Sequence, residues 1–334
     1  MSTPSRNEPC PCGSGLKYKR CCLSKTITIT PDANRSLHHE IQQATAGQEF
    51  QTMAEARRFI EQYMSSRNQT AQLDFAGLSS AQMHALLHAP FDSPEVVLFP
   101  EVLPSKPDAP VLKLFNLLAE AIGEEGVKTT AKGNLSQKLC RETALAYLGE
   151  EGVQEYTRYR GINKEEDFRE LHIVRLVAGL AGLLRKYKGS FVLTRKFRDV
   201  QARHGDAGIY PLLMRAYAVD YNWGHGDRYP ELGIVQQAFA FTLYLLQKYG
   251  KTQRPSEFYE KAFIRAFPMA LIEAGGSYFP PERTLSSCYA HRSFRNFAAF
   301  FGLVELSASG IDLLLNPFSL VKTPLLDEVI RFQK

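Results

Sequence analysis

The sequence predicts a mainly α-helical fold with a minor β component, organised in more than one domain. Apolar residues recur every three to four positions in several segments, which is the spacing of an amphipathic helix. The β-branched segments are short, and each follows a helical stretch and ends near a threonine. The length of 334 residues, with 44% hydrophobic and 22% charged residues, is that of a globular chain of two or three domains.

Four of the six cysteines lie at the start of the chain, in the segment RNEPCPCGSGLKYKRCC. They form two close pairs, and Gly13-Ser14-Gly15 provides a turn that brings the pairs together; the four residues are Cys10, Cys12, Cys21 and Cys22. Thiolates at this spacing can meet around a tetrahedral Zn²⁺ with Zn–S bonds of about 2.3 Å. Four protein ligands leave no open position, so we expect one structural zinc per chain that cannot activate water.

This segment resembles the SEC-C motif, C-x-C-x8-C-[CH], best known at the C-terminus of the bacterial preprotein-translocase ATPase. The N-E-P-C-P-C-G-S-G opening and the Y-K-R-C-C close both match, over about residues 5–25. The resemblance implies a zinc knuckle at residues 1–25 that docks onto a protein partner. It does not extend to the translocase's motor, because the chain contains no G-x-x-x-x-G-K-[ST]. The body also looks like that of bacterial and plasmid-borne SEC-C proteins.

A disulfide pair is the alternative interpretation of the clustered cysteines. Adjacent cysteines such as Cys21 and Cys22 form a strained bridge, and the polar, basic N-terminus has no apolar export signal. We therefore expect a reducing, cytoplasmic location, in which clustered cysteines indicate a metal site. No run of eighteen apolar residues predicts a membrane span. Cys140 and Cys288 lie in apolar helical segments and are predicted to be small core residues.

The net charge of +5 is concentrated near the N-terminus. Residues 1–30 contain one acidic residue, Glu8, against five basic residues: Arg6, Lys17, Lys19, Arg20 and Lys25. The remaining body is therefore nearly neutral, which differs from a nucleic-acid binder that is basic throughout.

Residues 26–48 read as a linker and residues 49–98 as a small helical region. Residues 49–65 have helical apolar spacing, and Ser79 or Ser80 is the expected N-cap of a second helix that ends at Pro90. His84 and His88 lie four residues apart on that helix, but no third metal ligand is adjacent, so a surface or packed pair is favoured. The proline-rich stretch 99–110 is the expected domain boundary.

From residue 111, a helix, a basic or glycine turn and a β-branched segment recur three times. The β-branched segments contain Val127-Lys128-Thr129, Val192-Leu193-Thr194 and Val321-Lys322-Thr323. A helix that ends in Gly-Leu and leads to a strand ending in Thr resembles the end of a winged-helix unit, whose hairpin is the wing. A helical bundle with short connecting strands is the alternative. We expect a winged-helix-like domain at 111–220 and a C-terminal helical domain at 221–334.

The second of these segments carries the main basic concentration of the body. The candidate nucleic-acid contacts are Arg185, Lys186, Lys188, Arg195, Lys196 and Arg198, with Tyr187 and Phe191 between them. Phosphate contacts need such cations, whose affinity falls as salt rises. A solvated hairpin face is the alternative.

The segment YNWGHGDRYPE holds the sole tryptophan, Trp223, with His225 and Asp227 between glycines. It predicts either a catalytic or metal-binding loop, or a turn that Trp223 docks onto the core. No G-x-S-x-G, H-E-x-x-H or Rossmann G-x-G-x-x-G is present. Paired carboxylates such as Glu165-Glu166 are interpreted as solvated charges near helix ends.

The sequence therefore predicts a non-enzymatic, zinc-binding adaptor whose knuckle docks onto a protein partner. A winged-helix DNA-binding protein linked to mobile elements is the second hypothesis, and an enzyme centred on His225 and Asp227 is the third. The nearly neutral body favours the first hypothesis, and the basic hairpin favours the second.

Overall fold

The computed structural model of the chain describes residues 39–275, 278–308 and 318–333. The chain divides into two compact units, residues 1–68 and residues 69–334. The mainly α-helical prediction is confirmed, since helices dominate and the sheets are small. Within the described residues, none of the helices combines the length and apolar character needed to cross a membrane.

The first unit contains a helix over residues 39–45 and the long helix α2 (Met53–Gln69). Arg67 joins the two, because its Nε lies 2.7 Å from Oε2 of Glu40. The sequence predicted a helix at 49–65, and α2 begins and ends four residues later. None of its residues is buried, and Met53 is 77% exposed.

The second unit opens with α3 (Ser80–His88), whose N-cap is Ser79. The Ser79 hydroxyl accepts from the Gln82 N–H, and the Gln82 side chain accepts from the Ser79 N–H, which completes a capping box. The chain then forms β1 (Val97–Leu98), which pairs antiparallel with β8 (Arg331–Phe332). This pairing joins the start of the unit to its end.

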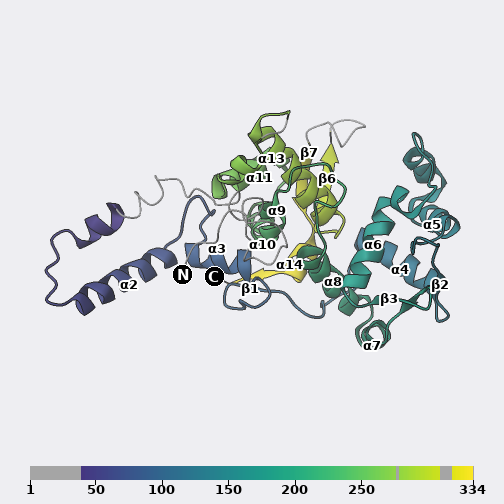
Figure 1. Ribbon diagram of the computed structural model, residues 1–334, viewed down its shortest axis with the longest axis horizontal. Helices are drawn as coiled ribbons and strands as arrows, with labels where there is room; N and C mark the ends of the chain where they lie inside the picture. Colours follow the sequence, from purple (N-terminus) through teal and green to yellow (C-terminus); the bar gives the residue numbers. More distant parts are fainter. Residues whose placement is uncertain (1–38, 276–277, 309–317, 334) are drawn as a thin grey trace, which may run out of the picture. The chain divides into compact units, whose positions relative to one another are not determined.

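Residues 110–193 form the first of two units that we call winged-helix-like solely because their last helix leads into a two-stranded hairpin. Along the chain its elements are α4 (Pro110–Ile122), β2 (Val127–Lys128), α5 (Gln137–Tyr156), α6 (Arg169–Leu180), β3 (Leu184–Tyr187) and β4 (Ser190–Leu193), with the 3-10 turn η2 (Glu165–Asp167) before α6. The strands form an antiparallel sheet in the order β2-β4-β3, and Figure 1 shows β2 and β3 beside α4. The last helix, α6, is followed by the two-stranded hairpin β3–β4.

The second winged-helix-like unit occupies residues 239–322 and repeats this order. Its elements are α10 (Phe239–Tyr249), β5 (Arg254–Pro255), α11 (Ser256–Ala266), α12 (Ala270–Glu273), α13 (Pro281–Tyr289), the π-helix η4 (Ala290–Ala299), β6 (Val304–Ala308) and β7 (Phe318–Lys322). Its sheet order, β5-β7-β6, is the counterpart of β2-β4-β3. The same topology therefore occurs twice in one chain.

Four helices connect the two winged-helix-like units: α7 (Arg195–His204), α8 (Asp206–Arg215), the π-helix η3 (Ala216–Asp220) and α9 (Gly233–Gln237). A fifth, α14 (Pro324–Val329), follows β7. The sequence interpretation counted three repeats, and the sheet pairing corrects this to two. Val127 pairs with Phe191, so the first and second predicted repeats share one sheet.

In both winged-helix-like units, the same turn connects the last helix to the hairpin. Gly182 and Gly302 have φ angles of 72° and 71°, a left-handed conformation that favours glycine. The following Leu183 and Leu303 donate their N–H groups back to the helix, at 2.9 and 2.8 Å. The Gly-Leu ending noted in the sequence is therefore the turn between the last helix and the hairpin.

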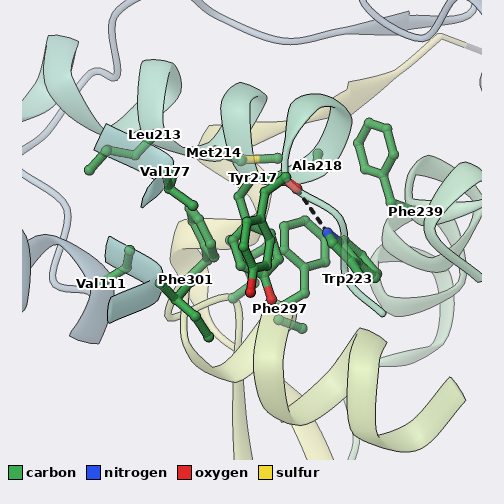
Figure 2. Packing of buried hydrophobic residues seen from close by; sticks show 14 of the residues in the cluster. Val111, Val177, Leu213, Met214, Tyr217, Ala218, Trp223, Phe239, Phe297 and Phe301 are labelled. Carbon is green, nitrogen blue, oxygen red and sulfur yellow. Dashed lines mark hydrogen bonds between the residues drawn. The ribbon is translucent and has the colours of Figure 1, made fainter. Parts of the chain in front are cut away.

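The two winged-helix-like units share one hydrophobic core, drawn in Figure 2. Val111 and Val177 come from the first unit, Phe297 and Phe301 come from the second, and Tyr217 of η3 lies between them. The Tyr217 ring is stacked on Phe297 with centroids 5.7 Å apart. The two units are therefore parts of one packed body, and Cys140 and Cys288 are fully buried in it as predicted.

Candidate functional site

The predicted zinc ligands Cys10, Cys12, Cys21 and Cys22 lie outside the described residues. The donor set fits Zn²⁺, because four thiolates supply the soft ligands and the coordination number that structural zinc sites use. Across residues 39–275, 278–308 and 318–333, no group of three His, Cys, Asp or Glu residues is placed to hold a metal ion. His84 and His88 form a ring pair with centroids 4.5 Å apart.

The structure places the first three candidate cations on the β3–β4 hairpin of the first winged-helix-like unit. Arg185 and Lys186 lie on β3, and Lys188 lies in the turn with a φ of 45°. The Arg185 guanidinium lies 5.0 Å from the Tyr187 ring centroid, and the Lys188 ammonium lies 5.3 Å from it. These side chains are exposed, and β3 is the edge strand of its sheet.

The other three candidate cations lie on α7, directly after the hairpin. Two of them donate to backbone carbonyls: Lys196 Nζ to Ala181 at 2.8 Å, and Arg198 Nη1 to Leu193 at 3.0 Å. These two side chains therefore help to join α7 to the end of α6 and to β4. Arg195 is 89% exposed and lies 3.5 Å from the Asp199 carboxylate.

Beside the hairpin, a buried carboxylate organises a polar cluster that the sequence interpretation missed. Glu165 was predicted to be a solvated charge, but its side chain is fully buried. Its carboxylate accepts from Arg175 Nε at 2.5 Å and from the Leu135 N–H at 2.5 Å, and it lies 2.7 Å from His172 Nδ1. Although burial acts to raise its pKa, these hydrogen bonds together hold the pKa of Glu165 below its ordinary value.

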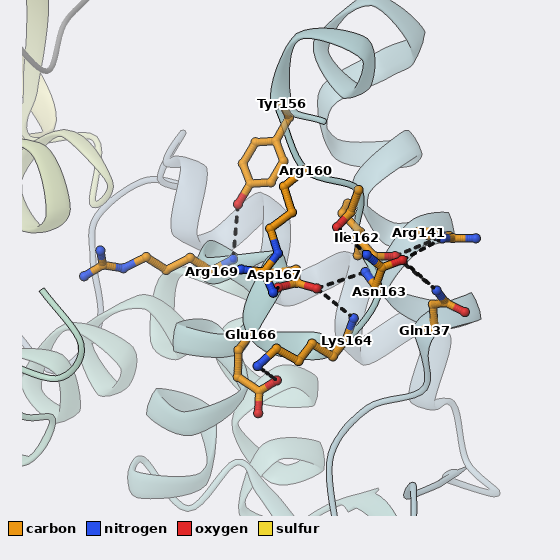
Figure 3. A network of polar contacts seen from close by, with 11 residues as sticks. Gln137, Arg141, Tyr156, Arg160, Ile162, Asn163, Lys164, Glu166, Asp167 and Arg169 are labelled. Atoms are coloured by element: carbon orange, nitrogen blue, oxygen red, sulfur yellow. Dashed lines mark hydrogen bonds and ion pairs between the residues drawn. The ribbon is translucent and has the colours of Figure 1, made fainter. Parts of the chain in front are cut away.

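A network of polar contacts around Asp167 and Asn163 holds the loop before α6, which contains Glu165 (Figure 3). Asp167 accepts from the N–H groups of Asn163 and Lys164, at 3.0 and 3.1 Å, and pairs with Arg160 at 3.0 Å. The spacing of His172 and Arg175, one turn apart on α6, was the available sequence signal for this cluster. Their partner Glu165 lies outside that helix, so periodicity alone could not identify it.

A pocket of about 530 Å³ opens next to this cluster. Its walls come from α6, from the β3–β4 hairpin and from residues 220–225. Arg175, Lys186 and His225 are among the lining residues, together with apolar residues of α6. The Arg175 guanidinium also lies over the Phe191 ring at 5.2 Å.

The loop around Trp223 is anchored by a buried ion pair. Asp227 accepts from Arg292 Nε at 2.6 Å and from Nη2 at 3.1 Å, and both side chains are at most 4% exposed. Burial acts to raise the pKa of Asp227, but the Arg292 hydrogen bonds bring it below its ordinary value. The Trp223 indole donates to the Tyr217 carbonyl at 2.8 Å. Trp223 therefore docks the loop onto the core, one of the two predicted alternatives.

His225 and Asp227 do not converge on each other. Both oxygens of Asp227 are bonded to Arg292, and one of them also accepts from the Tyr229 N–H. His225 is exposed, and its ring centroid lies 6.4 Å from that of His172. The structure thus assigns Asp227 to an ion pair and His225 to the rim of the pocket.

Comparison with known proteins identifies two segments of the chain. A SEC-C motif matches residues 6–24, and a Y4jL N-terminal domain matches residues 108–206, which span the first winged-helix-like unit and α7. The predicted SEC-C resemblance is thereby confirmed. No solved structure matches the chain.

Curated relatives share only short segments with the chain. The protein translocase subunit SecA of Helicobacter pylori (strain Shi470) is 85% identical over 20 residues, which are 6% of this chain and 2% of that protein. UPF0225 protein SG1365 of Sodalis glossinidius is 84% identical over 19 residues, or 6% of this chain and 12% of that protein. Protein YccF of Bacillus subtilis is 44% identical over 43 residues, or 13% and 12%. The chain spans 2 to 12% of the length of these relatives.

Proposed function

We propose that the protein is an adaptor: an N-terminal zinc knuckle docks onto a protein partner, and the tandem winged-helix-like body provides a second binding surface. The observation that carries this proposal is the complete C-x-C-x8-C-C set within the SEC-C match at residues 6–24. Relatives that match this segment include SecA proteins, named as subunits of a protein translocase. Cytoplasmic location is part of the same proposal.

One zinc ion per chain would be held by Cys10, Cys12, Cys21 and Cys22. The metal would supply the folding free energy of the knuckle, because a segment of about twenty residues buries too little apolar surface to fold alone. Elemental analysis of the reduced protein tests the stoichiometry. Cys10→Ser and Cys22→Ser are expected to weaken zinc binding sharply, and Cys140→Ser, which changes a fully buried thiol elsewhere, is the matched control.

The adaptor role is tested by partner capture from a native lysate, followed by binding of the identified partner in purified form. We expect binding by the wild-type chain and by Cys140→Ser, and loss of binding by Cys10→Ser and by a chain lacking residues 1–25. A purified partner that binds equally well without the knuckle would refute the adaptor proposal while leaving the zinc site intact.

Duplex DNA binding by the first winged-helix-like unit is the second candidate function. It is favoured by three exposed cations, Arg185, Lys188 and Arg195, on one hairpin and the helix that follows it. The helix α6 is not available to contact base edges, because it packs on η3 and its Arg175 is paired with Glu165. The expected contacts are therefore to phosphates, which carry no base identity.

The salt dependence of DNA affinity tests this candidate. The slope of log affinity against log salt should become shallower by about 0.9 for each phosphate contact that a charge-removing variant loses. Arg195→Gln and Lys188→Gln are the most informative variants, because neither residue lines the pocket beside α6. No DNA binding even at low salt would leave the adaptor function alone.

A further inference from the structure

The pocket between α6, the β3–β4 hairpin and the Tyr221–His225 loop combines positive charge with apolar walls. Its lining residues include the cations Arg175 and Lys186 together with the apolar residues Leu176, Leu180 and Phe191. Asp220 is the one carboxylate among its lining residues in the described part of the chain, and that residue is exposed to solvent. The balance of charge in the pocket favours an anion.

Arg175 is held in a fixed orientation toward this pocket. Its Nε donates to the buried Glu165 carboxylate, and the face of its guanidinium lies over Phe191. Its side chain remains 13% exposed, so part of the guanidinium is accessible from the pocket. A guanidinium fixed in this way is suited to bind an oxyanion, because its planar set of donors matches phosphate and carboxylate geometry.

Lys186 adds a positive charge whose ammonium is accommodated by a glycine. Gly133 has a φ of 82°, and a Cβ at that position would overlap the Lys186 ammonium. Within the described residues, Lys186 forms no ion pair, in contrast to Arg175, whose charge is balanced by Glu165. The combination supplies one oriented donor group and one uncompensated charge.

The apolar part of the pocket is open beside a second glycine. Gly179 lies on the same face of α6 as Arg175 and Leu176, and a Cβ placed on it would meet no atom within 4 Å. The volume of about 530 Å³ falls in the range of small-molecule sites, roughly 300–1,000 Å³. The space can therefore hold an organic group as well as an anion.

We propose that this pocket binds an aromatic phosphate monoester of the size of a nucleoside monophosphate. The phosphate would lie against Arg175 and Lys186, and the aromatic group would lie on Leu176, Leu180 and Tyr221. Among the candidate DNA contacts, only Arg185 and Lys186 line this pocket.

The test is isothermal titration calorimetry of the full, zinc-loaded chain with AMP, phenyl phosphate, adenosine and inorganic phosphate. We expect AMP or phenyl phosphate to bind, and adenosine and inorganic phosphate each to bind at least about tenfold more weakly, because each lacks one half of the recognised group. Failure of both organic phosphates at millimolar concentration, or binding of adenosine as tight as that of AMP, would overturn the proposal.

Three variants separate the pocket from general electrostatic attraction. Lys186→Gln should weaken binding of the phosphate by about tenfold, through loss of one charge-assisted contact. Gly179→Leu should weaken it at least as much without changing any charge, and leucine stabilises a helix relative to glycine. Arg195→Gln, outside the pocket, should leave it unchanged.

The same variants distinguish this site from DNA binding. DNA affinity should respond to Arg195→Gln and not to Gly179→Leu, whereas organic phosphate binding should respond in the opposite way. Equal weakening of phosphate binding by Arg195→Gln and Lys186→Gln, or insensitivity to Gly179→Leu, would show that the anion does not occupy the pocket.

Discussion

The first winged-helix-like unit ends in basic residues, whereas the second ends in apolar and acidic ones. After Thr194 the chain continues Arg-Lys-Phe-Arg, and after Thr323 it continues Pro-Leu-Leu-Asp-Glu. The hairpin strand β3 contains Arg185 and Lys186, but its counterpart β6 contains Glu305. The turn, the sheet order and a threonine hydroxyl that donates to the carbonyl of the turn glycine are nevertheless the same in both winged-helix-like units.

This difference shows which parts of the sequence specify the fold and which are free to provide binding chemistry. The shared parts are glycines with positive φ, threonines that bond back to the turn, and buried apolar residues of the last helix. Among the described residues, the exposed side chains of Arg185 and Lys188 contact only the neighbouring Tyr187 ring, so the charge of this hairpin can differ between the two winged-helix-like units. The two proposed ligands, duplex DNA and an aromatic phosphate, are therefore both assigned to the first winged-helix-like unit and its flanking residues.

Glu165 and Arg175 form a buried carboxylate–arginine pair within the first winged-helix-like unit, whereas Arg292 of the second pairs with Asp227 in the loop that precedes that unit. The two pairs differ in access to water. Arg292 is 4% exposed, and its remaining donors reach the carbonyls of Pro230 and Leu232. Arg175 is 13% exposed and faces the pocket. If its carboxylate partner is removed, Arg175 can therefore be hydrated, whereas Arg292 cannot.

Removal of the two carboxylates should give the largest difference between the units. Asp227→Ala should lower the free energy of unfolding by about 3–5 kcal/mol, because it leaves a buried charge without a partner. Glu165→Ala should cost less, about 1–3 kcal/mol, since water can reach Arg175. Urea unfolding followed by the fluorescence of Trp223, the sole tryptophan, measures both. A larger loss for Glu165→Ala would contradict the comparison.

Acid should break both pairs gradually. The folded-state pKa values of Asp227 and Glu165 lie below their ordinary values. The unfolded-state values are about 3.9 and 4.3, so the stabilisation is fully present above those values and is lost as pH falls through the lower folded-state values. Urea midpoints measured at decreasing pH should therefore fall more steeply for the wild type than for Asp227→Asn. Parallel pH profiles would show that Asp227 does not contribute.

The sequence was sufficient to predict the mainly helical class, the two buried cysteines, and Ser79 or Ser80 as the cap of α3. Of the basic wing expected near residues 185–203, the part up to Leu193 forms a hairpin, and the part from Arg195 on is the helix α7. These features depend on residues that are close along the chain. Pairing of Val127 with Phe191 and of Asp227 with Arg292 joins residues 64 and 65 positions apart. No local pattern specifies such partners, which explains the wrong repeat count. Glu165 was misassigned because its partners Leu135, His172 and Arg175 belong to neighbouring segments that helix periodicity does not relate to it.

Substitution of the two turn glycines by alanine should give the next largest difference in stability between the two winged-helix-like units. Alanine at either position takes on a left-handed conformation that costs about 1–2 kcal/mol. At Gly182 a Cβ would lie 3.7 Å from Lys196, an ordinary contact. At Gly302 it would lie 2.8 Å from the Asp108 carbonyl oxygen, which belongs to the backbone and cannot move freely. Gly302→Ala should therefore add about 1–3 kcal/mol of overpacking to the conformational cost. Equal urea midpoints for the two variants would disprove this.

The threonines that follow the two hairpins, Thr194 and Thr323, should give the smallest difference in stability. The Thr194 hydroxyl donates to the Gly182 carbonyl at 2.7 Å and accepts from the Phe197 N–H at 3.1 Å, so it joins the turn to α7. The Thr323 hydroxyl donates to the Gly302 carbonyl at 2.6 Å, but it does not cap α14. Valine keeps the branched shape and removes the hydroxyl. We expect Thr194→Val to cost about 1–2 kcal/mol, as an N-cap and a hydrogen bond are lost together, and Thr323→Val about 1 kcal/mol. Thermal and urea unfolding of the two variants decides; a larger cost at Thr323 would mean that the turn bond, and not the helix cap, dominates in both units.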